Sequence, residues 1–396
     1  MSVLRRPRFD RLFAPAKRLV LASFLIDVGA ACAMLALQFR GKELGASPLV
    51  LGFLGTAIFV IYVPISLLSG HLSDRWGRRC ITIIASAICM VAWFGMAAST
   101  SIVQLLVLAL AYGSGLGLLW PPVEAWLADL SGGSARLLNR HLGLFNIAWT
   151  GGLMAGPLVA GIAWESWNVA TFGAAGGVAL VCLLIAVFTP TAPPADTHIA
   201  PPSHVDTSRV WAFLLVSWCG VLGLSFCRGL IGTAFPNLAK TIGYSERLIG
   251  FLVFVLAGGQ GLTFFITRLT TGWQFRLWPL GVSMVTVIGA MVLSGLTGNP
   301  WVFAATFTVI GAALGVVYMA GITYAMMSEP ERRGQRAGLH EAIMGTGLVT
   351  GPFLGGFAAQ YINLQAPFLV GAVVVLLSLL AQIMVWVRLQ PRAGRA

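Results

Sequence analysis

The sequence predicts an all-α membrane protein with twelve transmembrane helices in two pseudo-symmetric six-helix bundles. Of its 396 residues, 58% are hydrophobic and only 10% are charged, and the mean hydropathy is +0.87. This composition excludes an ordinary water-soluble globular protein. Long runs without charged residues set the number of helices, because one bilayer crossing takes ~20 apolar residues.

Six spans are expected in the first half of the chain. Basic residues within 1–18 precede a hydrophobic run that is too long for a signal peptide, so this run is the first span. The 44 residues from Cys80 to Val123 carry no charge and make two spans. The expected spans are the run to Phe39, 48–69, the two parts of 80–123 around a break at 99–101, 142–163 and 169–188.

The stretch from Thr189 to Ser208 is rich in Pro, Ala, Thr and His, has no apolar period, and predicts a linker between two halves. The expected domains are therefore 1–189, a linker at 190–208, and 209–396. Charge-free runs then return. The six expected spans of the second half are 209–231, 248–267, the two parts of 277–328 around 298–300, and the two parts of 342–387 around 363–367.

The two halves are also related in sequence. Residues 44–45 and 51–53 recur as residues 242–243 and 249–251, 198 residues later. A second set recurs with an offset of 195 residues: Gly143, Gly152, Gly156, Pro157 and Gly161 return as Gly338, Gly347, Gly351, Pro352 and Gly356. Internal repetition of this kind is typical of transporters built from two bundles.

The basic residues predict the orientation in the plasma or inner membrane. With both termini in the cytoplasm, 20 of the 25 Lys and Arg residues fall on the cytoplasmic side. The net charge of +12 is thus spread over short loops. We therefore expect a lipid bilayer, and no nucleic acid, as the partner of this charge.

A charged turn between the second and third spans carries a distinctive pattern. It is made of Gly70, Leu72, Asp74, Arg75, Gly77, Arg78 and Arg79. This pattern resembles the loop between spans 2 and 3 of the major facilitator superfamily. The resemblance implies a cytoplasmic gate, in which Asp74 lies against the positive end of span 11 and Arg78 pairs with Asp129. Both contacts would join the halves only when the cytoplasmic side is closed. Glu341 and His340, one turn into span 11, are expected to be solvated or linked to this gate.

Spans 5 and 11 share a stripe of small residues with a proline. The stripe consists of Gly152, Gly156, Pro157 and Gly161 in the first, and Gly347, Gly351, Pro352 and Gly356 in the second. Small residues at this spacing allow close helix approach, and the proline removes one backbone hydrogen bond. The span 5 stripe resembles a motif of proton-coupled antiporters, from which it departs at Ala160. Ordinary helix packing is the alternative.

Charged residues inside spans are few and costly, so they predict function. Asp27 lies near the middle of span 1, and Arg228 of span 7 lies about one turn outward of it. A pair across a shared cavity would act as a proton switch, because protonating Asp27 would free Arg228. A permanent structural ion pair is the alternative. Glu124, after a Pro-Pro pair in span 4, is a second proton site, a counter-charge for a cationic substrate, or a side chain that reaches the inner surface.

Several aromatic and amide residues are candidates to line the cavity: Tyr112, Trp120, Asn146, Trp149, Tyr318 and Tyr324. Packing against helices or lipid is the alternative for each. The sequence contains no nucleophile with a base, no metal spacing and no glycine loop for phosphate. We therefore expect no enzyme activity, no cofactor and no metal.

The resemblance implies a secondary active transporter that moves a small molecule by alternating access. The chain looks most like the twelve-span exporters of drugs and metabolites, with proton-coupled efflux. We expect a monomer whose partners are a small-molecule substrate, protons and lipid. The alternatives are a proton-coupled importer of a small metabolite and a non-transporting membrane sensor of the same fold. The substrate itself is not readable from the sequence.

Overall fold

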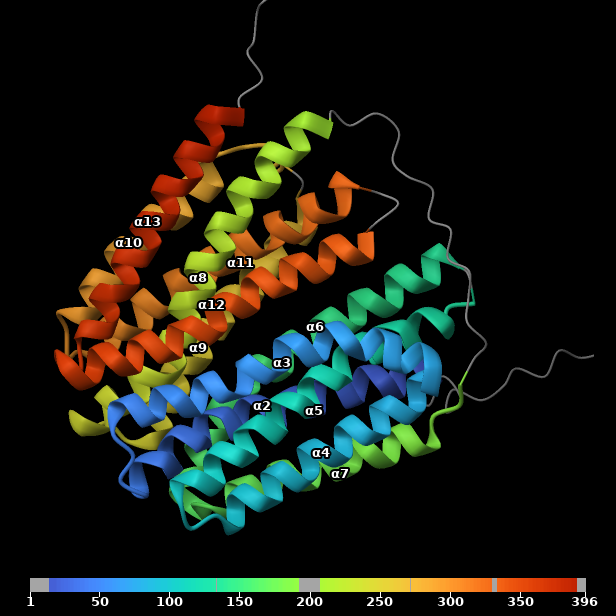
Figure 1. Cartoon of the computed structure of the whole chain (residues 1–396), viewed down its shortest axis with the longest axis horizontal. Helices are drawn as coiled ribbons and strands as arrows, with labels where there is room; N and C mark the ends of the chain where they lie inside the picture. Colours follow the sequence, from blue (N-terminus) through green and yellow to red (C-terminus); the bar gives the residue numbers. More distant parts are fainter. Residues whose placement is uncertain (1–13, 133, 192–206, 271, 330–332, 390–396) are drawn as a thin grey trace, which may run out of the picture.

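The computed structural model of the protein describes residues 14–132, 134–191, 207–270, 272–329 and 333–389. Within these residues, 12 helices are long and apolar enough to cross a membrane, and short turns connect them (Figure 1). The predicted all-α membrane fold is therefore confirmed. Residues 192–206 of the expected linker lie outside the described part of the chain.

The helices form two groups of six in chain order. The first half consists of α2 (Pro15–Glu43), α3 (Pro48–Trp76), α4 (Arg78–Ala98), α5 (Ile102–Asp129), α6 (Ala135–Trp167) and α7 (Ala170–Phe188). The second half consists of α8 (Thr207–Thr241), α9 (Glu246–Leu269), α10 (Trp278–Gly295), α11 (Pro300–Ser328), α12 (Arg333–Tyr361) and α13 (Ala366–Leu389).

The two halves meet along two helix pairs, α3 with α12 and α6 with α9. We call the end of the molecule where α7 ends and α8 begins the linker end, and the opposite end the far end. In Figure 1 the halves meet toward the far end and diverge toward the linker end. The far end carries the turns at 44–47, 99–101, 168–169, 242–245, 296–299 and 362–365.

The charged turn after the second span is much shorter than the sequence analysis expected. α3 continues through Trp76, and α4 begins at Arg78, so that only Gly77 breaks the helix. Its φ of 89° lies in the left-handed region, which glycine adopts without strain. The helix can extend to this point because the side chains of Asp74 and Arg75 in its last turn are exposed and can be solvated outside the bilayer.

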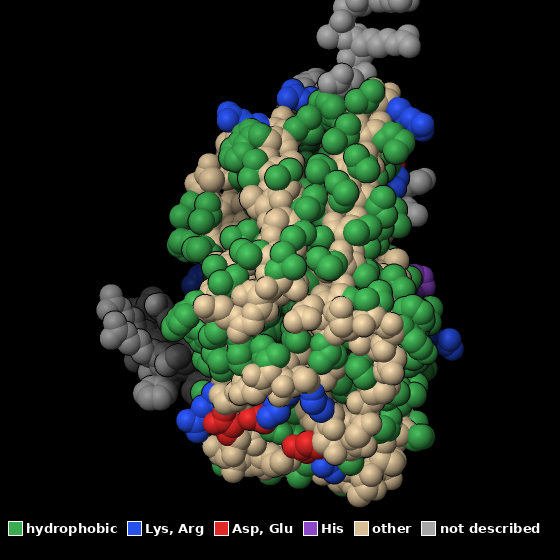
Figure 2. Space-filling view, turned by 90° about the vertical axis from the view of Figure 1, so that its left-hand side faces the viewer, with side chains coloured by type: hydrophobic (Ala, Val, Ile, Leu, Met, Phe, Trp, Pro, Cys, Tyr) green, Lys and Arg blue, Asp and Glu red, His purple; other side chains and the backbone are tan. Residues whose placement is uncertain are grey.

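The helices expose apolar side chains on their outer surface. Leu376, Leu377, Leu380 and Ile383 of α13, for example, are all exposed. On the face shown in Figure 2, hydrophobic side chains are spread over the whole surface, acidic side chains gather in its lower part beside basic ones, and further basic side chains lie at its upper end. Such a surface is stable only against lipid, since an exposed apolar area of this size would drive aggregation in water.

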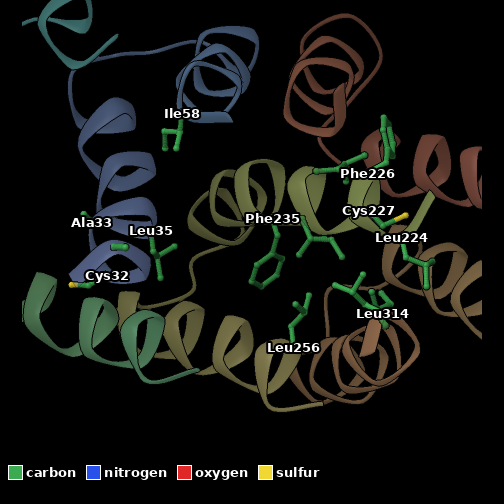
Figure 3. Close-up of a cluster of buried hydrophobic side chains, with 14 of the residues drawn as sticks. Cys32, Ala33, Leu35, Ile58, Leu224, Phe226, Cys227, Phe235, Leu256 and Leu314 are labelled. Atoms are coloured by element: carbon green, nitrogen blue, oxygen red, sulfur yellow. The ribbon is translucent and has the colours of Figure 1, made fainter. Parts of the chain in front are cut away.

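A continuous apolar core joins the two halves. Figure 3 shows Leu35 of α2 and Ile58 of α3 in the same cluster as Phe235 of α8, which points toward Leu256 of α9. Each of these four side chains is at most 5% exposed. The core therefore holds the halves together by packing, and the polar groups described next interrupt it.

Candidate functional site

Arg228 lies in the middle of α8 and faces the neighbouring helix α9. Its guanidinium group donates a hydrogen bond to Oε1 of Gln260. Gln260 is only 3% exposed, so this amide takes the place of water for a cation held within the bundle. The sequence analysis did not select Gln260. The presence of a polar residue in the apolar run of α9 was the available signal.

Asp27 is 8% exposed and lies on the face of α2 that packs against α6. A β-carbon added to Gly152 of α6 would lie 2.7 Å from the β-carbon of Asp27. Oδ2 of Asp27 has no hydrogen-bond partner among the described residues. A buried carboxylate oxygen without a donor is costly, and a bound proton or cation relieves that cost.

The expected direct pair between Asp27 and Arg228 is wrong in this conformation. The two side chains interact electrostatically, but no ion pair within 4.0 Å joins them among the ion pairs of the described residues. The physical reason is that α9 supplies Gln260 as a closer partner for Arg228. The carboxylate and the guanidinium group therefore interact electrostatically without forming a salt bridge in this conformation.

Glu341 is half-buried in α12, and its Oε1 accepts a hydrogen bond of 3.1 Å from the hydroxyl of Tyr318 in α11. The preceding residue, His340, is fully buried, and its ring centroid lies 4.9 Å from that of Tyr318. The burial of His340 corrects the expectation that it is solvated, while the alternative that both residues are linked to the gate stays a prediction. α12 begins at Arg333, so both residues lie two turns inside the helix.

Glu124 of α5 is exposed although its neighbours Pro122 and Val123 are buried. It interacts electrostatically with Glu341 of the other half. Tyr62 of α3 interacts with Glu124, Glu341 and Asp27. Electrostatic interactions and hydrogen bonds thus link five predicted residues and two others, Tyr62 and Gln260. This cluster, made of Asp27, Tyr62, Glu124, Arg228, Gln260, Tyr318 and Glu341, is called the central polar group below.

A row of aromatic rings runs from the first half to this group. The ring centroids of Trp149 and Phe264 are 6.2 Å apart, and those of Phe264 and Tyr318 are 5.5 Å apart. The indole nitrogen of Trp149 donates a hydrogen bond of 3.1 Å to Oδ1 of Asn146, which is exposed. Of the predicted cavity residues, Asn146, Trp149 and Tyr318 therefore lie between the halves.

Three other predicted cavity residues lie elsewhere. Tyr112 is 1% exposed inside the first half, where its hydroxyl donates to the carbonyl of Ala30. Tyr324 is also 1% exposed, and its hydroxyl accepts from the amide of Phe275 inside the second half. Trp120 is half-buried and lines a cavity of about 10 Å³ within the first half. Their helices turn these rings toward their own bundle.

The charged residues of the expected gate form a chain within the first half. Asp74 pairs with Arg78, and Nε of Arg78 lies 3.5 Å from Oδ2 of Asp129. The expectation that the pair of Arg78 with Asp129 joins the halves is wrong, because α4 and α5 belong to the same half. Asp74 is 64% exposed, and its contact with the beginning of α12 stays a prediction. Arg75 is exposed as well.

A second set of polar contacts joins the halves at the far end, and sequence reasoning missed it. Nζ of Lys42 donates to the backbone carbonyl of Asn237 at 2.9 Å and to the side-chain oxygens of Asn237 and Thr241 at 2.7 Å each. Glu165 of α6 pairs with Nε of Arg247 at 2.6 Å and accepts from its backbone amide.

The small-residue stripes serve close packing in both halves. A side chain at Gly152 or Gly156 would collide with the backbone of α2, and one at Gly347 or Gly351 with the backbone of α8. Gly161 and Gly356 instead meet helices of the opposite half, α9 and α3 respectively. The repeated positions therefore have repeated neighbours, as duplication predicts.

Comparison with known protein families gives one match over the described helices. The model described as "Major Facilitator Superfamily" matches residues 19–326 and 217–396. A multidrug efflux protein of Bacillus subtilis (strain 168), YfmO, is 24% identical over 86% of this chain and 85% of its own length. The quinolone resistance protein NorA of Staphylococcus aureus is 24% identical over 89% of this chain and 94% of its own length.

Solved structures share the fold. A bacterial homologue of the human lysosomal transporter Spinster, in an inward-facing and unoccupied conformation, superposes with a TM-score of 0.72 at 14% identity and covers 95% of both chains. The nucleoside transporter NupG superposes with a TM-score of 0.73 at 14% identity over 94% of this chain and 99% of its own. At such identities these structures show the architecture alone.

Proposed function

The chain belongs to the major facilitator superfamily, and from this premise we propose that it exports small organic molecules across the plasma membrane in exchange for protons. Membership makes the protein an integral membrane transporter. Efflux is favoured because two relatives that match most of the chain are described as a multidrug efflux protein and a quinolone resistance protein. Quinolones are therefore the first substrates to test.

The environment of Asp27 is the main support for proton coupling. Its carboxylate lies in the middle of a membrane helix, is 8% exposed, and has an oxygen without a hydrogen-bond partner among the described residues. The cation Arg228 acts on it from the opposite half. A proton on Asp27 would weaken this attraction between the halves, so protonation and the relative position of the halves would be linked.

Alternating access would follow from the way the halves meet. The far-end contacts, such as Lys42 with Asn237 and Glu165 with Arg247, hold this conformation closed at the far end. We propose that the linker end faces the cytoplasm, since this orientation gives 20 of the 25 basic residues a cytoplasmic position. The conformation would then be the one that takes up substrate from the cytoplasm.

The test uses purified protein in proteoliposomes with an imposed pH gradient and a fluorescent quinolone. Protein inserted with its linker end outward should accumulate the quinolone when the lumen is acidic, and Asp27→Asn should remove this dependence on the gradient. Arg388→Gln, at the exposed end of α13, is the control. Release of preloaded quinolone from the lumen when the lumen is acidic would indicate proton-coupled import, and unchanged proton drive in Asp27→Asn would exclude Asp27 as the coupling acid.

A further inference from the structure

We propose that the buried amide of Gln38 in α2 favours opening of the far end, because its hydrogen-bonding groups are left without partners while the far end is closed. The inference rests on the alternating access of the proposed function, but not on the substrate, the direction of transport or the coupling ion. It assigns to one side chain of α2 a destabilising effect on the closed form, opposite to that of Lys42.

Gln38 is a polar side chain enclosed in the apolar core. It is 2% exposed, and its neighbours Leu37 and Phe39 are 0% and 3% exposed and belong to that core. Neither Oε1 nor Nε2 of Gln38 has a hydrogen-bond partner among the residues that the structure describes. An amide that leaves water without gaining a hydrogen bond costs free energy, and the cost is largest in apolar surroundings. The Gln38 amide therefore destabilises the closed conformation.

Gln38 lies on the face of α2 that meets α8 of the other half. A β-carbon added to Gly232 of α8 would lie 3.3 Å from Cε of Met34. Eight residues further along α2, Nζ of Lys42 donates to Asn237 of the same helix α8. Met34, Gln38 and Lys42 follow each other at intervals of four residues, so they lie within a sector of about 80° with Gln38 in its middle. The amide is thus buried at the contact between the halves.

Gln38 lies in the layer that closes the far end. It is about 6 Å along the helix axis from Lys42, and about 16 Å from Asp27 of the central polar group in the direction of the far end. One turn from Gln38, Leu35 belongs to the same apolar cluster as Phe235 of α8 (Figure 3). Separation of α2 from α8 would admit water to this layer and satisfy the amide. Opening therefore removes the cost of the Gln38 amide, whereas it breaks the hydrogen bonds of Lys42.

The internal repeat indicates that the fold does not require an amide at this position. The offset of 198 residues relates Lys42 to Lys240, and Gln38 to Pro236 of α8. Pro236 has no hydrogen-bonding group in its side chain, and α8 continues as a helix through it. Methionine matches glutamine in length and lacks the amide, so Gln38→Met changes the polarity of this side chain with little change of its shape.

The experiment measures the open fraction of the far end in purified full-length protein, without substrate and without a pH gradient. Pulsed electron spin resonance between labels at Thr100 and Gln365, exposed far-end residues of different halves, reports this fraction. Lys42→Gln provides a background in which more of the protein is open. In that background Gln38→Met should lower the ratio of open to closed protein about tenfold, which corresponds to about 1.4 kcal/mol.

Gln382→Met is the matched control, because it removes a buried amide that has a partner within one half. Gln382 of α13 is 4% exposed, and its Nε2 donates to the carbonyl of Val216 in α8 at 3.0 Å. This variant should leave the ratio of open to closed protein unchanged. Thermal unfolding in detergent provides a second measurement. Gln38→Met alone should raise the midpoint, since the closed form is stabilised, and Gln382→Met should lower it.

A variant that fails to fold is recognised by size-exclusion chromatography, and Gln38→Leu then replaces Gln38→Met in the same measurements. An open fraction that stays equal or rises when the Gln38 amide is removed, or a midpoint that fails to rise, would overturn the inference. An equal shift of the open fraction in Gln382→Met would do so as well. If both shifts occur and no quinolone moves under a pH gradient, the proposed function fails and this inference stands. Gradient-driven quinolone transport with an open fraction insensitive to Gln38→Met gives the reverse result.

Discussion

The ammonium group of Lys42 in the first half donates hydrogen bonds to the backbone carbonyl and to the side chain of Asn237 in the second half, at 2.9 and 2.7 Å. Asn237 lies in the last turns of α8, which ends at Thr241. The helix dipole favours a cation at this end of a helix. Lys42 thus joins the halves at the far end by binding the C-terminal turns of a helix of the opposite half.

Replacing Lys42 should favour opening of the far end. Lys42→Gln removes the charge and the donors to Asn237 and Thr241, and a loss of about 1.5 kcal/mol from the closed form would raise the open population about tenfold. Pulsed electron spin resonance between labels at Thr100 and Gln365, exposed far-end residues of different halves, should show a longer-distance component. Lys240→Gln is the matched control, because Lys240 pairs with Glu246 of its own half. An identical distance distribution in both variants would contradict the prediction that Lys42 holds the far end closed.

Enlarging Gly152 should separate α6 from α2. A side chain there would lie within 3.0 Å of the amide nitrogen of Val28 and 2.7 Å from the β-carbon of Asp27. We expect Gly152→Val to cost roughly 1 to 3 kcal/mol by overpacking and to abolish transport. Gly143→Val tests the same change where no atom lies within 4 Å of the added carbon. Thermal unfolding in detergent should therefore separate the two variants, and equal midpoints would refute this packing role.

Removing the charge of Asp74 should impair transport while leaving insertion intact. In this conformation Asp74 pairs with Arg78, and it is exposed, so its contribution to folding is small. The gate hypothesis requires its charge when the linker end closes against α12. Asp74→Asn should lower the transport rate at least tenfold at an unchanged amount of protein in the membrane, measured in vesicles. Full transport in Asp74→Asn would show that the charge of Asp74 is not part of the gate.

Two tyrosines should affect stability and spare substrate binding. Tyr324→Phe leaves the amide of Phe275 without its 2.7 Å acceptor, which costs about 1 to 3 kcal/mol for a buried donor. Tyr112→Phe removes a donor to the carbonyl of Ala30, which keeps its place in a helix, so we expect a smaller loss. Thermal unfolding measures both, and quinolone transport should stay within twofold of that of the unchanged protein. A loss of transport without a loss of stability would place these rings at the substrate site.

The number of helices and their approximate positions were predictable from the sequence alone. A bilayer core requires about 20 apolar residues per crossing and leaves no backbone group unsatisfied, so hydropathy reports helices directly. The helix ends were less predictable. α6 continues through Glu165 to Trp167, and α8 extends to Thr241, ten residues beyond the predicted end. Polar residues at these ends are compatible with helix once they leave the hydrocarbon.

The internal repeat also predicted close packing at particular glycines. Gly152 and Gly347, 195 residues apart, both lie against the first helix of their own half. The charged residues inside spans were identified because each is expensive in lipid. Residue type and position in a span were sufficient for Asp27, Glu124 and Arg228 to be selected.

The partners of these residues were decided only by the tertiary structure. Tyr318 and Tyr324 lie six residues apart in α11, yet one bonds to Glu341 between the halves and the other to Phe275 inside its bundle. Lipid-facing and protein-facing sides of a membrane helix are both apolar, so the sequence carries little signal about rotation around the helix axis. Arg228 meets Gln260, and Lys42 meets Asn237, because helix rotation and crossing bring them together. The rotation and the crossing of a helix depend on how all twelve helices pack together, whereas the residues of one span are enough to determine that this span crosses the membrane.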